Sequence, residues 1–143
     1  MVAVVVTILI AAIPTFVLVE FLAKRRRLTR WKLGRERVSD DEFLTSLGQF
    51  SFRQDAAVRV RTSISHATRI PADLISANDK IHELEVVGNL LHSSILDYFT
   101  DVLPVKKPKN ESDLLTVRDF VIEFGPQLNQ GDQLNLTKSM TKL

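Results

Sequence analysis

The side chains best suited to chemistry are three histidines and two neighbouring glutamates, and their spacing does not assemble an enzyme. His66, His82 and His92 fall in three separate segments, so no pair has the one-turn spacing of a helical zinc site. Glu83 and Glu85 point to different sides and offer no acid–base pair. The chain has no cysteine, which removes disulfides, thiolate metal ligands and a cysteine nucleophile. No phosphate-binding or nucleophile-elbow motif occurs. The sequence therefore predicts a protein that is not an enzyme and takes no cofactor, metal or small-molecule substrate.

Residues 1–23 predict a membrane-spanning helix. No charged residue occurs from Val2 to Val19, and the stretch from Val2 to Ala23 reaches about 33 Å as a helix, against a hydrocarbon core of about 30 Å. A cleaved secretory signal fits poorly, because nothing basic precedes this long apolar run. Basic residues follow the run, so the positive-inside rule predicts a single-pass protein with its N-terminus outside and its C-terminal domain in the cytoplasm.

The net charge of +2 is the sum of opposed blocks. Residues 24–37 hold eight basic side chains and one acidic side chain, whereas the chain from Val38 onward holds 11 basic and 15 acidic ones. We expect the basic segment to contact anionic lipid, with docking to an acidic partner subunit as the alternative. Binding of nucleic acid is not expected, because the basic run adjoins the predicted span. The residues expected at the membrane interface are Lys24, Arg25, Arg26, Arg27, Arg30 and Trp31.

The remaining chain predicts an all-α domain, since no stretch alternates as a strand does. Ser39-Asp40-Asp41-Glu42 predicts a capping box that opens a short helix ending near Gly48. A longer helix is expected over 54–70, with Arg59, Arg61 and Arg69 turned away from its apolar face. The predicted organisation is a transmembrane helix (1–23), a basic juxtamembrane segment (24–37), a short amphipathic helix (38–50), a helical domain (51–125) and a polar tail (126–143).

Within that domain, residues 72–84 predict a loop with apolar anchors, and residues 86–103 predict a second long helix. Thr116 is expected to cap a third helix that Gly125 and Pro126 end. Residues 127–143 are expected to order only against a partner. The side chains expected to be buried in the second helix are Val87, Leu90, Leu91, Ile95, Tyr98, Phe99 and Val102, and those in the third are Val117, Phe120, Val121 and Phe124.

Three short motifs resemble the acyl carrier protein family over residues 55–124. They are Ile70-Pro71-Ala72-Asp73-Leu74-Ile75, Asp79-Lys80-Ile81-His82-Glu83-Leu84 and Leu115-Thr116-Val117-Arg118-Asp119-Phe120-Val121. The resemblance implies a small helical bundle in which a serine at the start of the second helix carries phosphopantetheine. Counting from the motifs on either side places Gly88 at that position, so the attachment hydroxyl is missing. Ser93 and Ser94 are the nearest hydroxyls, and Ser94 is the remaining candidate for the phosphopantetheine site, although both are expected to lie inside the helix.

These observations predict a non-catalytic, membrane-anchored docking or accessory subunit of a larger bacterial membrane protein complex, either bioenergetic or biosynthetic. Its expected partners are the lipid bilayer and integral membrane subunits of that complex. The alternative is a working membrane-tethered acyl carrier protein in lipid or polyketide metabolism. The residues expected to dock a partner are Asn89, His92, Asp97 and Asp101.

Overall fold

The computed structural model describes residues 18–140, with side chains described over 18–128. The chain divides into two compact units, residues 1–35 and 36–143. Every regular element within the described residues is a helix, apart from one isolated antiparallel bridge between Lys80 and Thr116. This content fits the all-α prediction.

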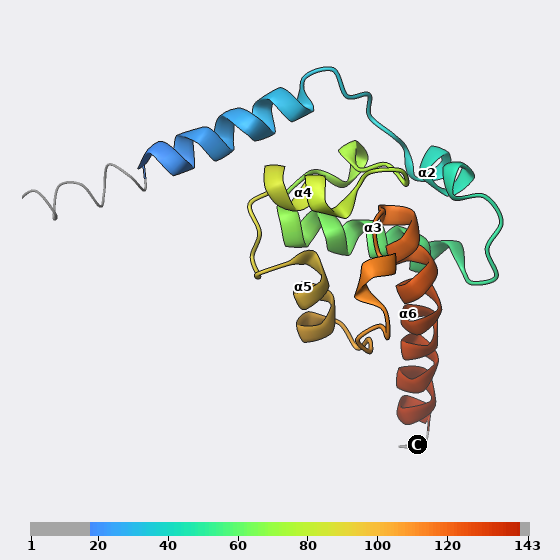
Figure 1. The fold of residues 1–143 in the computed structure, drawn as a ribbon. Helices are drawn as coiled ribbons and strands as arrows, with labels where there is room; N and C mark the ends of the chain where they lie inside the picture. The colour runs from blue at the N-terminus through green and yellow to red at the C-terminus, as the bar shows by residue number, and fades with distance from the viewer. Residues whose placement is uncertain (1–17, 141–143) are drawn as a thin grey trace, which may run out of the picture. The chain divides into compact units, whose positions relative to one another are not determined.

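The described part of the first unit is a helix over residues 18–32, drawn in blue in Figure 1. It takes in residues 18–23 of the predicted span and continues through the basic segment, and residues 1–17 lie outside the described part of the chain. Among the helices that the structure describes, none is long and apolar enough to cross a membrane. This finding does not support the predicted single-pass topology, in which the N-terminus lies outside and the C-terminal domain in the cytoplasm.

The second unit is a bundle built around one central helix, α3 (Figure 1). Helices α2, α5 and α6 all pack against α3. The elements are α2 (Asp40–Leu47), α3 (Gln54–Thr68), the 3-10 helix η1 (Ala72–Leu74), α4 (Ile81–Val87), α5 (Ile95–Val102), the 3-10 helix η2 (Glu111–Asp113) and α6 (Val117–Met140).

The core joins the apolar face of α3 to aromatic side chains from α5 and α6. Val60 and Ile64 of α3 are completely buried, as the helical spacing of the apolar residues predicts. Phe99 of α5 lies 5.3 Å from Phe120 and 5.0 Å from Phe124, measured between ring centroids. Such tilted and edge-on ring contacts add to the hydrophobic effect of burial. These contacts fix α5 and α6 against each other.

The predicted capping box at the start of α2 is confirmed. The Ser39 hydroxyl accepts a hydrogen bond from the Glu42 N–H at 3.2 Å, and a Glu42 carboxylate oxygen accepts one from the Ser39 N–H at 2.8 Å. These bonds satisfy N–H groups that a helix start otherwise leaves unpaired. The bond from the Ser39 N–H to the Glu42 carboxylate, followed by one from the Ser39 hydroxyl at 2.9 Å, holds the pKa of Glu42 below its usual value. The helix ends at Leu47 and is followed by Gly48, whose positive φ of 81° is one that glycine adopts without strain.

The predicted long helix over 86–103 is wrong, because α4 ends at Val87 and α5 begins only at Ile95. The predicted loop over 72–84 is correspondingly too long, since α4 already begins at Ile81. Of the expected buried stripe, Ile95 and Phe99 are fully buried, whereas Leu91 and Val102 are exposed. The remaining members, Val87, Leu90 and Tyr98, are half-buried.

Helix α6 also differs from the prediction at its end. Thr116 caps it as expected, accepting a hydrogen bond from the Asp119 N–H at 3.3 Å, and its expected inward side chains are buried. However, the helix runs through Gly125 and Pro126 to Met140, so the predicted helix end at these two residues is wrong. Pro126 has no N–H to donate to the carbonyl of Ile122, which lies four residues earlier in the helix.

Candidate functional site

The connection between α4 and α5 gathers most of the residues expected to dock a partner. We call residues 88–97, which comprise this connection and the first turn of α5, the α4–α5 surface. It contains Asn89, which is exposed, and His92 and Asp97, which are half-buried. Asp101 lies four residues beyond Asp97 on α5 and is exposed. The structure therefore brings three of the four predicted docking residues into one short segment.

The α4–α5 surface is held in place by the C-terminal end of α3. The Asn89 N–H donates to the Thr68 carbonyl at 2.8 Å, and the Leu91 N–H donates to the Ala67 carbonyl at 3.1 Å. These carbonyls end α3 and have no partner within their own helix, so the connection satisfies them. The shape of this non-helical segment is thereby fixed by the bundle.

Gly88 permits this close approach. A Cβ at this position would lie 2.7 Å from the Leu84 carbonyl oxygen and 2.8 Å from the Thr68 Cβ, closer than side chains approach in real structures. Its φ of −74° is open to any residue, so the requirement for glycine comes from space and not from backbone strain. A serine, the residue that the acyl carrier resemblance implies at this position, does not fit there.

Two serines directly precede α5, which corrects the prediction that they lie inside a helix. The Ser94 hydroxyl caps α5 by accepting a hydrogen bond from the Asp97 N–H at 3.0 Å. The Ser93 hydroxyl donates to the Asp97 carboxylate. Glu85 of α4 adds a third contact, because its carboxylate accepts the Ile95 N–H at 2.9 Å. The Glu85 contact ties the end of α4 to the start of α5.

Charge at this helix start is concentrated on Asp97. Hydrogen bonds, first from Ser93 and then from Ser94, hold the pKa of Asp97 below its usual value. The side chain therefore remains a carboxylate at neutral pH, next to the N-terminal end of α5, where negative charge is favoured. The arrangement stabilises the helix start and leaves no proton on Asp97 for acid catalysis.

The histidines do not form a site. The His92 ring lies 5.3 Å from the Tyr98 ring in an edge-to-face arrangement, and its Nδ1 is buried without a hydrogen-bond partner in the described structure. His66 and His82 are exposed on α3 and α4. Across the described residues, no group of three histidine, aspartate or glutamate side chains could hold a metal ion.

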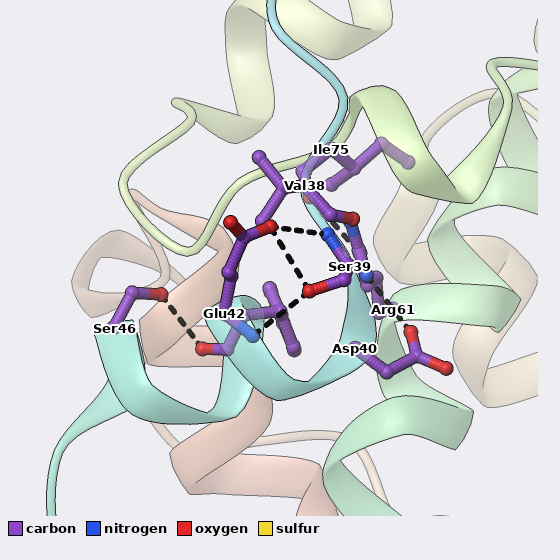
Figure 2. A network of polar contacts seen from close by, with 8 residues as sticks. Val38, Ser39, Asp40, Glu42, Ser46, Arg61 and Ile75 are labelled. Atoms are coloured by element: carbon purple, nitrogen blue, oxygen red, sulfur yellow. Dashed lines mark hydrogen bonds and ion pairs between the residues drawn. The ribbon is translucent and has the colours of Figure 1, made fainter.

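A buried arginine is the polar centre that the sequence interpretation missed. Arg61, expected to face solvent, is only 1% exposed. Its Nε donates to the Ile75 carbonyl at 3.0 Å, and its two terminal nitrogens bind the Asp40 carboxylate at 2.9 Å and the Val38 carbonyl at 2.6 Å (Figure 2). Its guanidinium carbon also lies 4.6 Å from the centre of the Phe43 ring.

All three guanidinium nitrogens of Arg61 are used within the chain, so this cation has a structural role. It fastens the segment before α2 to α3, and Figure 2 shows the capping box of Ser39 and Glu42 beside it. The sequence does contain one indication that Arg61 faces inward. Arg61 lies four residues after Ala57 and three before Ile64, at the edge of the apolar stripe of α3.

An open pocket of about 320 Å³ lies beside α2. Its walls mix two apolar side chains with short polar ones, and basic residues and histidines are absent from them. The pocket therefore offers no group for acid–base chemistry apart from a single carboxylate. The lining residues are Asp41, Leu44, Thr45, Gly48, Phe50 and Gln54.

The residues expected at a membrane interface lie on the helix over 18–32. Lys24, Arg25, Arg26, Arg27 and Arg30 are all exposed, and Trp31 is half-buried beneath Arg35, whose guanidinium carbon lies 3.6 Å from the centre of the indole ring. Contact of these residues with lipid stays a prediction.

Comparisons of the chain with protein-family models, curated proteins and solved structures found no match. The resemblance to acyl carrier proteins therefore stays a prediction, supported by its motifs alone.

Proposed function

We propose that this chain is a non-catalytic docking or accessory subunit of a larger protein complex, and that the α4–α5 surface is one of its contact sites. The observation that carries the proposal is an apolar side chain, Leu91, which is 50% exposed on a segment of fixed shape. Exposed apolar side chains on a rigid frame contribute to binding at little cost in conformational entropy.

The surroundings of Leu91 suit a protein contact. Asn89 offers an exposed side-chain amide, and Asp97 offers a carboxylate whose pKa is lowered further by its hydrogen bonds. A central apolar side chain with polar groups around it is the usual composition of a protein–protein interface. The segment needs no refolding to bind, because the bonds to α3 and Glu85 already hold it.

The proposal can be tested with a charge placed at Leu91. The tagged full chain and its Leu91→Glu variant would be expressed in the source organism, and co-purifying proteins would be quantified by mass spectrometry. We expect Leu91→Glu to remove at least one specific partner, because a buried, unpaired carboxylate opposes the interface. A partner that is retained in full contradicts the proposed site.

Leu115→Glu is the matched control. Leu115 is 66% exposed and lies just before α6, so the same substitution adds the same charge at a leucine that is somewhat more accessible than Leu91. Both variants should keep the wild-type circular dichroism spectrum and melting temperature. Equal loss of partners from both variants would indicate a general effect of charge, and would also contradict the proposed site.

A second candidate function is an acyl carrier activity that uses Ser94. One observation favours it: Ser94 lies at the start of α5, whereas the sequence interpretation placed it inside a helix. Co-expression with a phosphopantetheinyl transferase, followed by mass spectrometry, separates the two functions. A mass increase that matches the prosthetic group and disappears in Ser94→Ala supports the carrier activity. An unchanged mass supports the docking function.

A further inference from the structure

The helix over 18–32 has two chemically different halves. Its first turns expose the apolar side chains of Leu18, Val19, Phe21 and Leu22. From Lys24 onward the exposed side chains of the helix are basic instead, apart from Thr29. Apart from Glu20, which is exposed in the first turn, the apolar and the charged residues are thus separated along the helix axis rather than onto two opposite faces.

The basic half is charged on all sides. Lys24, Arg25, Arg26 and Arg27 occupy four consecutive positions, and successive residues of a helix are about 100° apart around its axis. Their four side chains therefore surround the helix. With Arg30 they form no ion pair with any other described residue.

We propose that this helix inserts into an acidic groove of a partner protein, with carboxylates along the groove and an apolar floor at one end. This inference rests on the proposed function and names the chemistry of a partner. The walls of a groove can contact basic side chains that point in several directions from the helix, whereas a flat surface contacts only one side of the helix. Arginine is suited to carboxylates because its planar group donates two parallel hydrogen bonds.

The apolar half favours a protein groove over nucleic acid. The major groove of DNA also encloses a helix, but it offers little apolar surface to side chains such as Phe21 and Leu22. Stacking of bases on Trp31 is hindered, because Arg35 already covers one face of the indole ring at 3.6 Å. In a protein groove, an apolar floor can pack against the apolar half of the helix while carboxylates bind the basic half.

The full chain can report this binding directly, because Trp31 is its only tryptophan and lies on the helix. Its fluorescence would be titrated with a synthetic helical peptide of Glu and Leu, and with a peptide of equal charge in which Ser replaces Leu. We expect the Glu/Leu peptide to bind at least about tenfold more tightly. Duplex DNA and vesicles of phosphatidylglycerol with phosphatidylcholine complete the set of probes.

Charge reversal tests the arginines. The double variant Arg26→Glu/Arg27→Glu should weaken binding of the Glu/Leu peptide by about tenfold or more. The matched control is Lys106→Glu/Lys109→Glu, which changes the net charge equally at two exposed lysines of the second unit. An equal effect of the control overturns the inference.

Other outcomes are equally decisive. Equal affinity for the two peptides, or tighter binding to DNA or to vesicles, overturns the assignment to a protein groove. Leu91→Glu lies in the other unit and should leave peptide binding unchanged. Failure of peptide binding together with Leu91-dependent partner capture would therefore refute this inference and leave the proposed function standing.

Discussion

Replacing Arg61 with leucine should destabilise the bundle strongly. The substitution leaves the carbonyls of Ile75, which is buried, and Val38, which is half-buried, without their guanidinium donors. An unsatisfied buried acceptor costs about 1–3 kcal/mol, and less where water reaches it. The bond to Asp40 adds little, because that side chain is 61% exposed and water screens the pair. Leucine recovers part of the packing against Phe43. We expect a net loss of about 3 kcal/mol, chiefly from the two carbonyls that lose their donors.

Urea unfolding, followed by circular dichroism, measures this effect. With a slope of about 1–3 kcal/mol per molar urea, the midpoint should fall by about 1–3 M. Arg59→Leu is the matched control, since Arg59 is an exposed arginine on the same helix, and its effect should stay within about 1 kcal/mol. An Arg61→Leu variant as stable as the Arg59→Leu variant would refute the structural role assigned to Arg61.

Three further predictions concern the α4–α5 surface and the start of α2. Gly88→Ala should cost about 1–3 kcal/mol in unfolding experiments, because the new Cβ meets Thr68 at 2.8 Å; an unchanged stability would refute the close approach. Ser39→Ala should cost about 1 kcal/mol by loss of the capping box, measured in the same way, and no loss would show that the cap is dispensable. Ser93→Ala should raise the pKa of Asp97, measured by NMR titration. The pKa of Asp97 is lowered in the folded chain, so its carboxylate stabilises the fold at pH values above its ordinary pKa. This contribution to stability disappears as the pH falls through the lowered pKa. A pKa of Asp97 that is the same in the variant and the wild type would contradict the hydrogen bond from Ser93.

Elements specified by local chemistry were predictable from the sequence. The capping box at Ser39 and the cap at Thr116 depend on side chains within three residues, and both occur in the structure. The inward faces of α3 and α6 follow from the spacing of apolar residues. Short-range geometry decides these features, so one sequence suffices.

Features that depend on distant contacts were not predictable. Val87, Leu90, Leu91 and Ile95 are apolar side chains at helical spacing, yet the carbonyls of Thr68 and Ala67 accept hydrogen bonds from the N–H groups of Asn89 and Leu91, and the helix is interrupted there. Gly125 was expected to end α6, but the ring of Phe52 occupies the space where a Cβ would lie, so packing explains this glycine better than a helix end does.

The candidate site was predicted in part. Asn89, His92 and Asp97 were selected from a helix that does not exist, and the structure places them together on the α4–α5 surface. The role of Ser94 as a cap was missed, because the helix start was placed too early. Leu91 was expected to be buried, and its exposure now carries the proposed function.

Hydrogen exchange of the chain, alone and in the complex purified with its partner, tests the docking proposal most directly. We expect exchange to slow over residues 88–97 in the complex. Protection confined to other parts of the second unit, with residues 88–97 exchanging as fast as in the free chain, would contradict the proposal.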